Sequence, residues 1–148
     1  MLRACLSLAL AAIAVPCAAQ SVQPWETAIA GALGKSGSEM PGGVYRVGLP
    51  RSDLKVTLDG VAIKPALALG SWVAFMREGQ ADQVMLMGDL VLTDAEVNPV
   101  MQRLVQGGID ITALHNHLLS SVPHTMYMHV AARGDGPRLA ATLRAPWR

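Results

Sequence analysis

The sequence QVMLMGDLVLTDAEVNPVMQRLVQGG, residues 83–108, joins an apolar run of strand length directly to the start signal of a helix. The run covers residues 83–92 and ends at Thr93. Thr93 and Glu96 have the spacing of a capping box, in which two side chains satisfy the free backbone N–H groups of a helix start. Apolar residues continue at helical spacing to Gly107-Gly108, a typical helix end. This stretch predicts a fold that mixes strands and helices.

Pro99 leaves a second start open for this helix, with Asn98 as the cap and Pro99 as the first helical residue.

On the N-terminal side, three further strand-like runs precede this stretch, with a turn signal at Asp59-Gly60 in the second of them. These runs are residues 44–49, 55–63 and 71–76. Residues 64–69 are ambiguous between helix and loop.

Two apolar runs on the C-terminal side predict a β-hairpin, with residues 120–123 as its turn. Gly134-Asp135-Gly136-Pro137 then opens a short helix through Leu139 and Leu143 that stops before Pro146. The order is βββ β-α-ββ-α, without an internal repeat. We therefore predict a single α+β domain: an antiparallel sheet with two helices packed on one face.

The N-terminus has the pattern of an export signal. Arg3 precedes an apolar run over residues 6–15, and Cys17-Ala18-Ala19 supplies small residues for cleavage after Ala19. Pro16 disfavours lipidation of Cys17, because a small residue is expected there. Residues 1–19 are thus predicted to be a signal peptide, and the protein periplasmic or secreted.

Residues 20–42 are predicted to precede the main domain, which spans residues 43–148. A short amphipathic helix is expected within residues 20–35, around Trp25, Ile29 and Leu33. Residues 34–43, which follow it, are rich in Gly, Ser and Pro, and we interpret them as a linker.

The composition after cleavage excludes several classes of protein. Both cysteines lie in residues 1–19, so thiol chemistry and cysteine metal sites are excluded. Loss of Arg3 leaves 11 basic residues beside 11 acidic ones. This balance gives no electrostatic basis for binding nucleic acid. The signal run is too short for a comfortable membrane span, so no span is expected after cleavage.

All four histidines of the chain lie between residues 115 and 129. His115 and His117 are two apart, so on a strand they point to one face. If the hairpin forms, His129 joins them there, and Met126 and Met128 face the other side. Three imidazoles on one face are a typical ligand set for zinc or copper. His124, beside the turn, is an additional candidate ligand. The alternative is that strand histidines form hydrogen bonds at a surface, in a ligand groove or at a dimer contact.

Four other side chains are candidates to assist such a site. Glu96 could act as a carboxylate ligand or general base, as could its neighbour Asp94, although capping alone explains Glu96. Asp89 could reach the site from a strand end, or be a turn residue. Tyr127 could donate a proton or hydrogen bond, or be a packed aromatic residue with a satisfied hydroxyl.

Four methionines alternate along two of the predicted strands: Met85, Met87, Met126 and Met128. Thioethers are soft ligands for copper(I), but we interpret these residues as core filling, because alternation is what a half-buried strand requires.

Several blocks of the sequence resemble the bacterial LppY/LpqO-like family. They are Gly43-Val44-Tyr45-Arg46, Asp53-Leu54-Lys55-Val56, Leu69-Gly70-Ser71-Trp72, Met87-Gly88-Asp89-Leu90-Val91-Leu92-Thr93, Glu96-Val97-Asn98-Pro99, Thr112-Ala113-Leu114-His115-Asn116-His117, Met126-Tyr127-Met128-His129 and Gly134-Asp135. The resemblance covers roughly residues 43–145, with the His-Asn-His block as its most specific part. It implies an exported protein without an established activity.

Longer members of that family carry two copies of this unit, whereas this chain has one. The resemblance therefore implies a surface on which two copies pack, and we predict a two-fold homodimer.

The sequence as a whole predicts an exported protein that binds a divalent metal through its histidines, as a metal-dependent enzyme or a metal carrier. The alternative is a metal-free binding or interaction module of the cell envelope.

Overall fold

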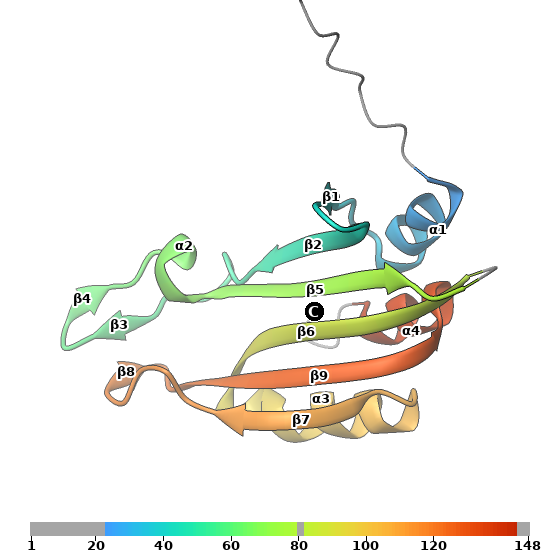
Figure 1. Cartoon of the computed structure of the whole chain (residues 1–148). Coiled ribbons are helices and arrows are strands. Elements are labelled where there is room, and N and C mark those ends of the chain that lie inside the picture. Colours follow the sequence, from blue (N-terminus) through green and yellow to red (C-terminus); the bar gives the residue numbers. More distant parts are fainter. Residues whose placement is uncertain (1–22, 80–81, 145–148) are drawn as a thin grey trace, which may run out of the picture.

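The computed structural model describes residues 23–79 and 82–144 (Figure 1). The predicted signal peptide lies outside these residues. The described residues form four helices and nine strands. They are α1 (Pro24–Leu33), β1 (Ser38–Met40), β2 (Val44–Pro50), β3 (Thr57–Leu58), β4 (Val61–Ala62), α2 (Pro65–Ala68), β5 (Gly70–Arg77), β6 (Gln83–Thr93), α3 (Asp94–Gln106), β7 (Asp110–His115), β8 (Ser121–Val122), β9 (Thr125–Asp135) and α4 (Gly136–Leu143).

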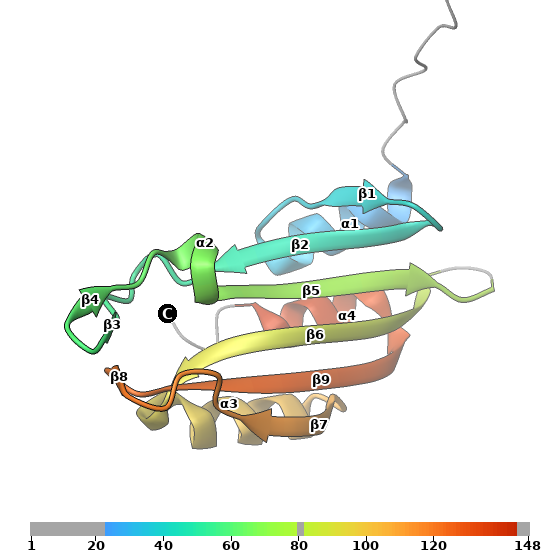
Figure 2. The same ribbon diagram turned by 60° about the vertical axis from the view of Figure 1, so that its left-hand side comes forward.

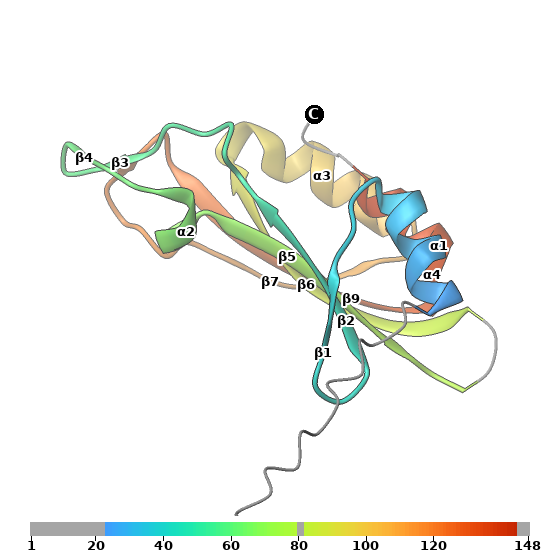
Figure 3. The same ribbon diagram turned by 90° about the horizontal axis from the view of Figure 1, so that it is seen from above.

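The large sheet has the strand order β1-β2-β5-β6-β9-β7, and every neighbouring pair is antiparallel. Helices α1, α3 and α4 all lie on one face of it (Figure 3). The predicted α+β class is confirmed. The prediction of two helices on that face was incomplete, because α1 packs against α4 and joins the same layer.

The main core lies between these helices and the sheet. The predicted amphipathic helix is confirmed: Trp25, Ile29 and Leu33 are buried and belong to this core. The strands contribute every second residue, such as Phe75 and Leu86, as expected for a sheet with one covered face. None of the helices in the described part of the chain is long and apolar enough to cross a membrane.

Most elements match their sequence signals. The capping box of Thr93 and Glu96 starts α3, and Pro99 lies inside that helix, so the start at Asn98 was wrong. The run over residues 55–63 is the short β3–β4 pair around the Asp59-Gly60 turn, and residues 64–69 include α2. The linker interpretation missed β1, whose pairing with β2 depends on chain reversal at Gly42 and Gly43 rather than on its own residues.

The predicted hairpin exists as the antiparallel pair β7–β9, but its connection is not a tight turn. Residues 116–124 leave the large sheet, and β8 within them pairs with β3. The result is a small sheet, β4-β3-β8, that lies beyond the end of the large one (Figure 2). The turn prediction for residues 120–123 failed because β8 finds its partner far away in the sequence.

The face of the large sheet opposite α1, α3 and α4 is called the open face here. At the end nearest the small sheet, a second apolar cluster covers it, formed by Val56, Leu69, Val91 and Tyr127. Beyond this cluster the open face is free of the three long helices (Figures 1 and 3). His129 lies two residues after Tyr127 on β9, where this covered end meets the free part of the open face.

Candidate functional site

Strand pairing places His115 and His129 on the open face. His115 lies opposite Tyr127, and Ala113 lies opposite His129. Directly opposite residues share a face of an antiparallel pair, so His115, Tyr127 and His129 lie on one side. The prediction that His115 and His129 share a face is confirmed. They are diagonal neighbours rather than a directly opposed pair.

Counted back from His115, strict alternation along β7 predicts Ala113 and Ile111 on the histidine face. This prediction was wrong for Ile111, which pairs with Val130 and packs against the main core. A register shift between Ile111 and Ala113 adds one residue to the strand. Such a bulge reverses the facing of everything that follows it. The histidines therefore reach the open face while Ile111 stays in the core.

The two histidines of the His-Asn-His block point their ring nitrogens at each other. The Nε2 atoms of His115 and His117 are 2.9 Å apart. This is a hydrogen-bond distance, with one ring donating and the other accepting. The ring of His129 lies 4.9 Å from that of His115, centroid to centroid, and is tilted by 56°. We call His115, His117 and His129 the histidine cluster.

Asp89 lies directly opposite His129 in the pairing of β6 with β9. Its Oδ2 atom is 3.8 Å from Nε2 of His129. Its Oδ1 atom is buried and accepts no hydrogen bond from any described residue. Asp89 is therefore a strand residue beside the histidine cluster, with an acceptor atom still available.

Tyr127 supports the cluster with its ring rather than its hydroxyl. The rings of His117 and Tyr127 are stacked, 3.7 Å apart and 9° from parallel. The hydroxyl donates a hydrogen bond to the carbonyl oxygen of Ala68, 2.7 Å away. Burial raises the pKa of Tyr127, and the negative charge of Asp89 adds to the increase. The residue is thus a fixed platform for His117.

His124 lies outside the histidine cluster. Its Nδ1 atom is 2.9 Å from Oδ1 of Asp94, and its Nε2 atom is 3.4 Å from the side-chain nitrogen of Asn116. Both ring nitrogens are engaged in the loop that leads to the small sheet. The structure therefore ties this candidate ligand to the first turn of α3.

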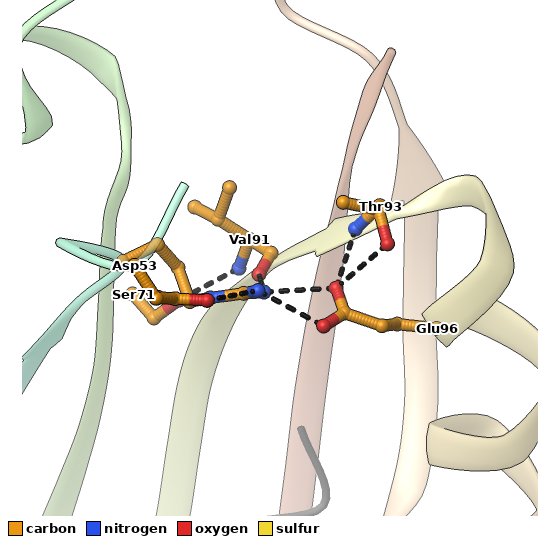
Figure 4. A network of polar contacts seen from close by, with 6 residues as sticks. Asp53, Ser71, Val91, Thr93 and Glu96 are labelled. Atoms are coloured by element: carbon orange, nitrogen blue, oxygen red, sulfur yellow. Dashed lines mark hydrogen bonds and ion pairs between the residues drawn. The ribbon is translucent and has the colours of Figure 1, made fainter. Parts of the chain in front are cut away.

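Glu96 is engaged by an arginine that the sequence analysis did not single out. Its two carboxylate oxygens each accept a hydrogen bond of 2.9 Å from Arg51, which is 1 % exposed. Glu96 also accepts hydrogen bonds from the backbone N–H and the hydroxyl of Thr93 (Figure 4). Arg51 also donates to the backbone oxygen of Val91. Glu96 therefore ties the start of α3 to the end of β2.

The charges in this network stabilise each other. Burial alone would raise the pKa of Glu96, but hydrogen bonds from Arg51 and Thr93 hold it below its ordinary value. Burial would likewise lower the pKa of Arg51, but hydrogen bonds to Asp53 and Glu96 raise it. No local pattern marked Arg51, because its partner Glu96 lies on a distant segment.

In residues 23–79 and 82–144, no group of three or more His, Asp or Glu side chains is arranged as it stands to hold a metal ion. The facing nitrogens of His115 and His117 supply two donors, and His129 and Asp89 lie beside them on the open face.

A family model described as Domain of Unknown Function (DUF1259) matches residues 27–148. The chain belongs to this family. No curated protein and no solved structure matches it. The DUF1259 match runs from α1 to the C-terminus and so includes every candidate site residue named above. The family description assigns no function.

Proposed function

We propose that this protein binds a divalent transition-metal ion, zinc or copper, through the histidine cluster. The observation that carries the proposal is the 2.9 Å separation between the Nε2 atoms of His115 and His117. Two imidazole nitrogens that bind one tetrahedral zinc at about 2.0–2.1 Å lie roughly 3.3 Å apart. An ion that replaces the shared proton therefore needs only a small opening of the pair.

His129 is proposed as the third ligand. Its side chain is 45 % exposed, and its Nε2 atom lies 3.8 Å from Oδ2 of Asp89. If one ring nitrogen of His129 binds the ion, the other is left to donate a hydrogen bond to a carboxylate, and Asp89 is the neighbouring one. Carboxylates commonly hold metal-binding histidines in this way, and the unsatisfied Oδ1 of Asp89 suits that role.

Three imidazoles leave one position of a zinc ion open for water or an anionic ligand. A zinc-bound water has its pKa lowered toward ~7. The site would therefore serve a metal-dependent hydrolytic enzyme or a metal carrier. A metal-free module, in which the hydrogen-bonded histidines line a ligand groove, is the competing function that the experiment below separates.

The proposal includes the place of action. The signal pattern of residues 1–19 and the resemblance to the LppY/LpqO-like proteins support export to the periplasm or beyond. In such a compartment a histidine site remains usable where thiols are oxidised.

Calorimetry on the mature protein, purified without a histidine tag, tests the proposal. We expect about one zinc or copper(II) ion per chain at neutral pH, with affinity falling below pH ~6 because only neutral imidazole is a ligand. His117→Ala should remove most of the binding. His124→Ala is the matched control and should leave it unchanged, because His124 is held by Asp94.

Absence of zinc, copper and nickel uptake by the wild-type protein at neutral pH would refute metal binding and favour the metal-free module. An equal loss of affinity in His117→Ala and His124→Ala would also contradict the assignment of ligands.

A further inference from the structure

The open face carries a group of thioether side chains beyond the histidine cluster. Met76 on β5 lies directly opposite Met85 on β6, and Met87 is the next residue of β6 on the same face. They line an open hollow whose walls are almost wholly apolar, together with Val44, Ala74 and Phe75. We call Met76, Met85 and Met87 the methionine group.

The interpretation of these methionines as core filling was half wrong. Met126 and Met128 pair with Leu92 and Leu90 on the helix-covered side, and Met128 is fully buried. Met87, by contrast, is 53 % exposed on the open face. Burial therefore does not account for it.

On β5 and β6, the methionines lie on one face of the sheet and the buried hydrocarbon side chains lie on the other. The buried residues that face the helices are Val73, Phe75, Val84, Leu86, Leu90 and Leu92, with no methionine among them. The methionines of these two strands occupy only the open face. A face that needed only apolar surface would be served equally by Leu or Val, so the segregation points to a role for the sulfur atoms.

The three sulfur atoms lie within reach of one point. Directly opposed residues have Cβ atoms about 4.5–5.5 Å apart, and diagonal neighbours such as Met76 and Met87 about 7–8 Å. The methionine side chain has three rotatable bonds and adapts easily. The three thioethers can therefore converge over the hollow without movement of the backbone.

We infer that the methionine group binds a soft monovalent metal ion, copper(I). Soft thioether ligands select copper(I), whereas imidazole and carboxylate ligands suit divalent ions. The described residues contain no cysteine, so methionine supplies all of their sulfur ligands. The charge of Arg133, which lies opposite Met85, is balanced by Glu78 at 3.3 Å, and the guanidinium of Arg46, which lies opposite Ala74, is over the ring of Trp72.

This inference does not depend on the proposed histidine site. The two sites use different donor atoms on the same face and select ions of different charge. Each can therefore be removed by substitution while the other is left in place.

Titration of the mature protein with silver(I), a redox-inert probe, in chloride-free buffer tests the methionine group. Competition with a chromogenic copper(I) chelator under anaerobic conditions repeats the test with copper(I). The triple variant Met76→Leu, Met85→Leu, Met87→Leu keeps volume and polarity and should lower the affinity for both ions by at least about tenfold. Met101→Leu on α3, where Met101 packs at the edge of the main core, is the matched control and should bind like wild type.

Two further measurements keep the sites apart. With methyl-labelled methionine, silver(I) should shift the NMR signals of the methionine group and leave those of Met126 and Met128 in place. His115→Ala, His117→Ala should retain silver(I) binding, and the triple leucine variant should retain zinc binding. Unchanged silver(I) affinity in the triple leucine variant, or loss of it in the double histidine variant, would overturn the inference.

Discussion

Arg51 is the residue whose side chain most clearly opposes the hydrophobic pattern around it. It is buried at the end of β2, yet its guanidinium donates to Glu96, Asp53 and the backbone oxygen of Val91. A buried charge is tolerated when it is paired and hydrogen-bonded in this way. Removal of one partner is costly, because the remaining charge is left without compensation.

Glu96→Gln should therefore destabilise the protein by about 2–3 kcal/mol in urea unfolding at pH 7. Glutamine retains the capping geometry, so the loss reports the ion pair with Arg51. Glu78→Gln is the control: it removes the more exposed ion pair with Arg133 and should cost less than about 1 kcal/mol. Similar losses of unfolding free energy in both variants would mean that the buried Arg51–Glu96 pair stabilises the fold no more than the exposed Arg133–Glu78 pair.

The same pair predicts a pH dependence with a definite sign. The pKa of Glu96 is lowered in the folded state, so as the pH falls the unfolded chain takes up its proton first. The stabilisation is complete above the unfolded pKa of ~4.3 and is lost as the pH falls through the lowered folded pKa. The stability difference between wild type and Glu96→Gln should shrink below pH ~4.3. A difference that grows on acidification would contradict this.

At the scale of elements, the face of the sheet on which a methionine of β6 or β9 lies determines how much it stabilises the fold. Met128 on β9 is fully buried under the helices, whereas Met87 on the paired strand β6 faces outward and is half exposed. Met128→Asp should cost about 3–5 kcal/mol, because it buries an unpaired charge. Met87→Asp should change the free energy of unfolding by less than about 1 kcal/mol.

Thermal or urea unfolding followed by circular dichroism measures this pair. His115→Ala should also be mild for folding, since its ring lies on the open face. If Met87→Asp proved as damaging as Met128→Asp, the open face would be covered in solution, and the assignment of the two faces would fail.

For the whole molecule, the end that carries the small sheet has several of the most exposed apolar side chains of the described residues. Leu119, just before β8, is 84 % exposed, and Val122 on β8 is 67 % exposed. Leu67 on the neighbouring α2 is also exposed, whereas Val61 faces the opposite side of the small sheet from Val122. Exposed apolar residues such as Leu119 and Val122 are typical of interaction surfaces. We propose that this end of the molecule forms the two-fold homodimer.

Sedimentation at micromolar concentration should show a dimer of the mature chain. Leu119→Lys, Val122→Lys should shift it to monomer through charge repulsion across the two-fold axis. Val105→Lys is the control, because Val105 is an exposed apolar residue on α3, away from the small sheet. A wild-type monomer at every concentration would disprove self-association.

Local signals were enough to predict the elements that form from their own residues. The strand-to-helix junction at Thr93 and Glu96 was confirmed because a capping box is closed within four residues. The amphipathic helix around Trp25 was confirmed because helical spacing by itself defines which face is apolar. Strand-like runs of residues likewise predicted β2, β5 and β6, and with them the α+β class.

The amino-acid sequence by itself thus determined the main elements and the shared face of His115 and His129. Only the tertiary structure decided what depends on distant partners: the excursion of β8 to β3, the bulge that turns Ile111 inward, the Arg51–Glu96 pair and the outward facing of Met85 and Met87. The physical reason is the same each time. Periodicity shows that two faces differ, but which face is covered depends on where the helices pack.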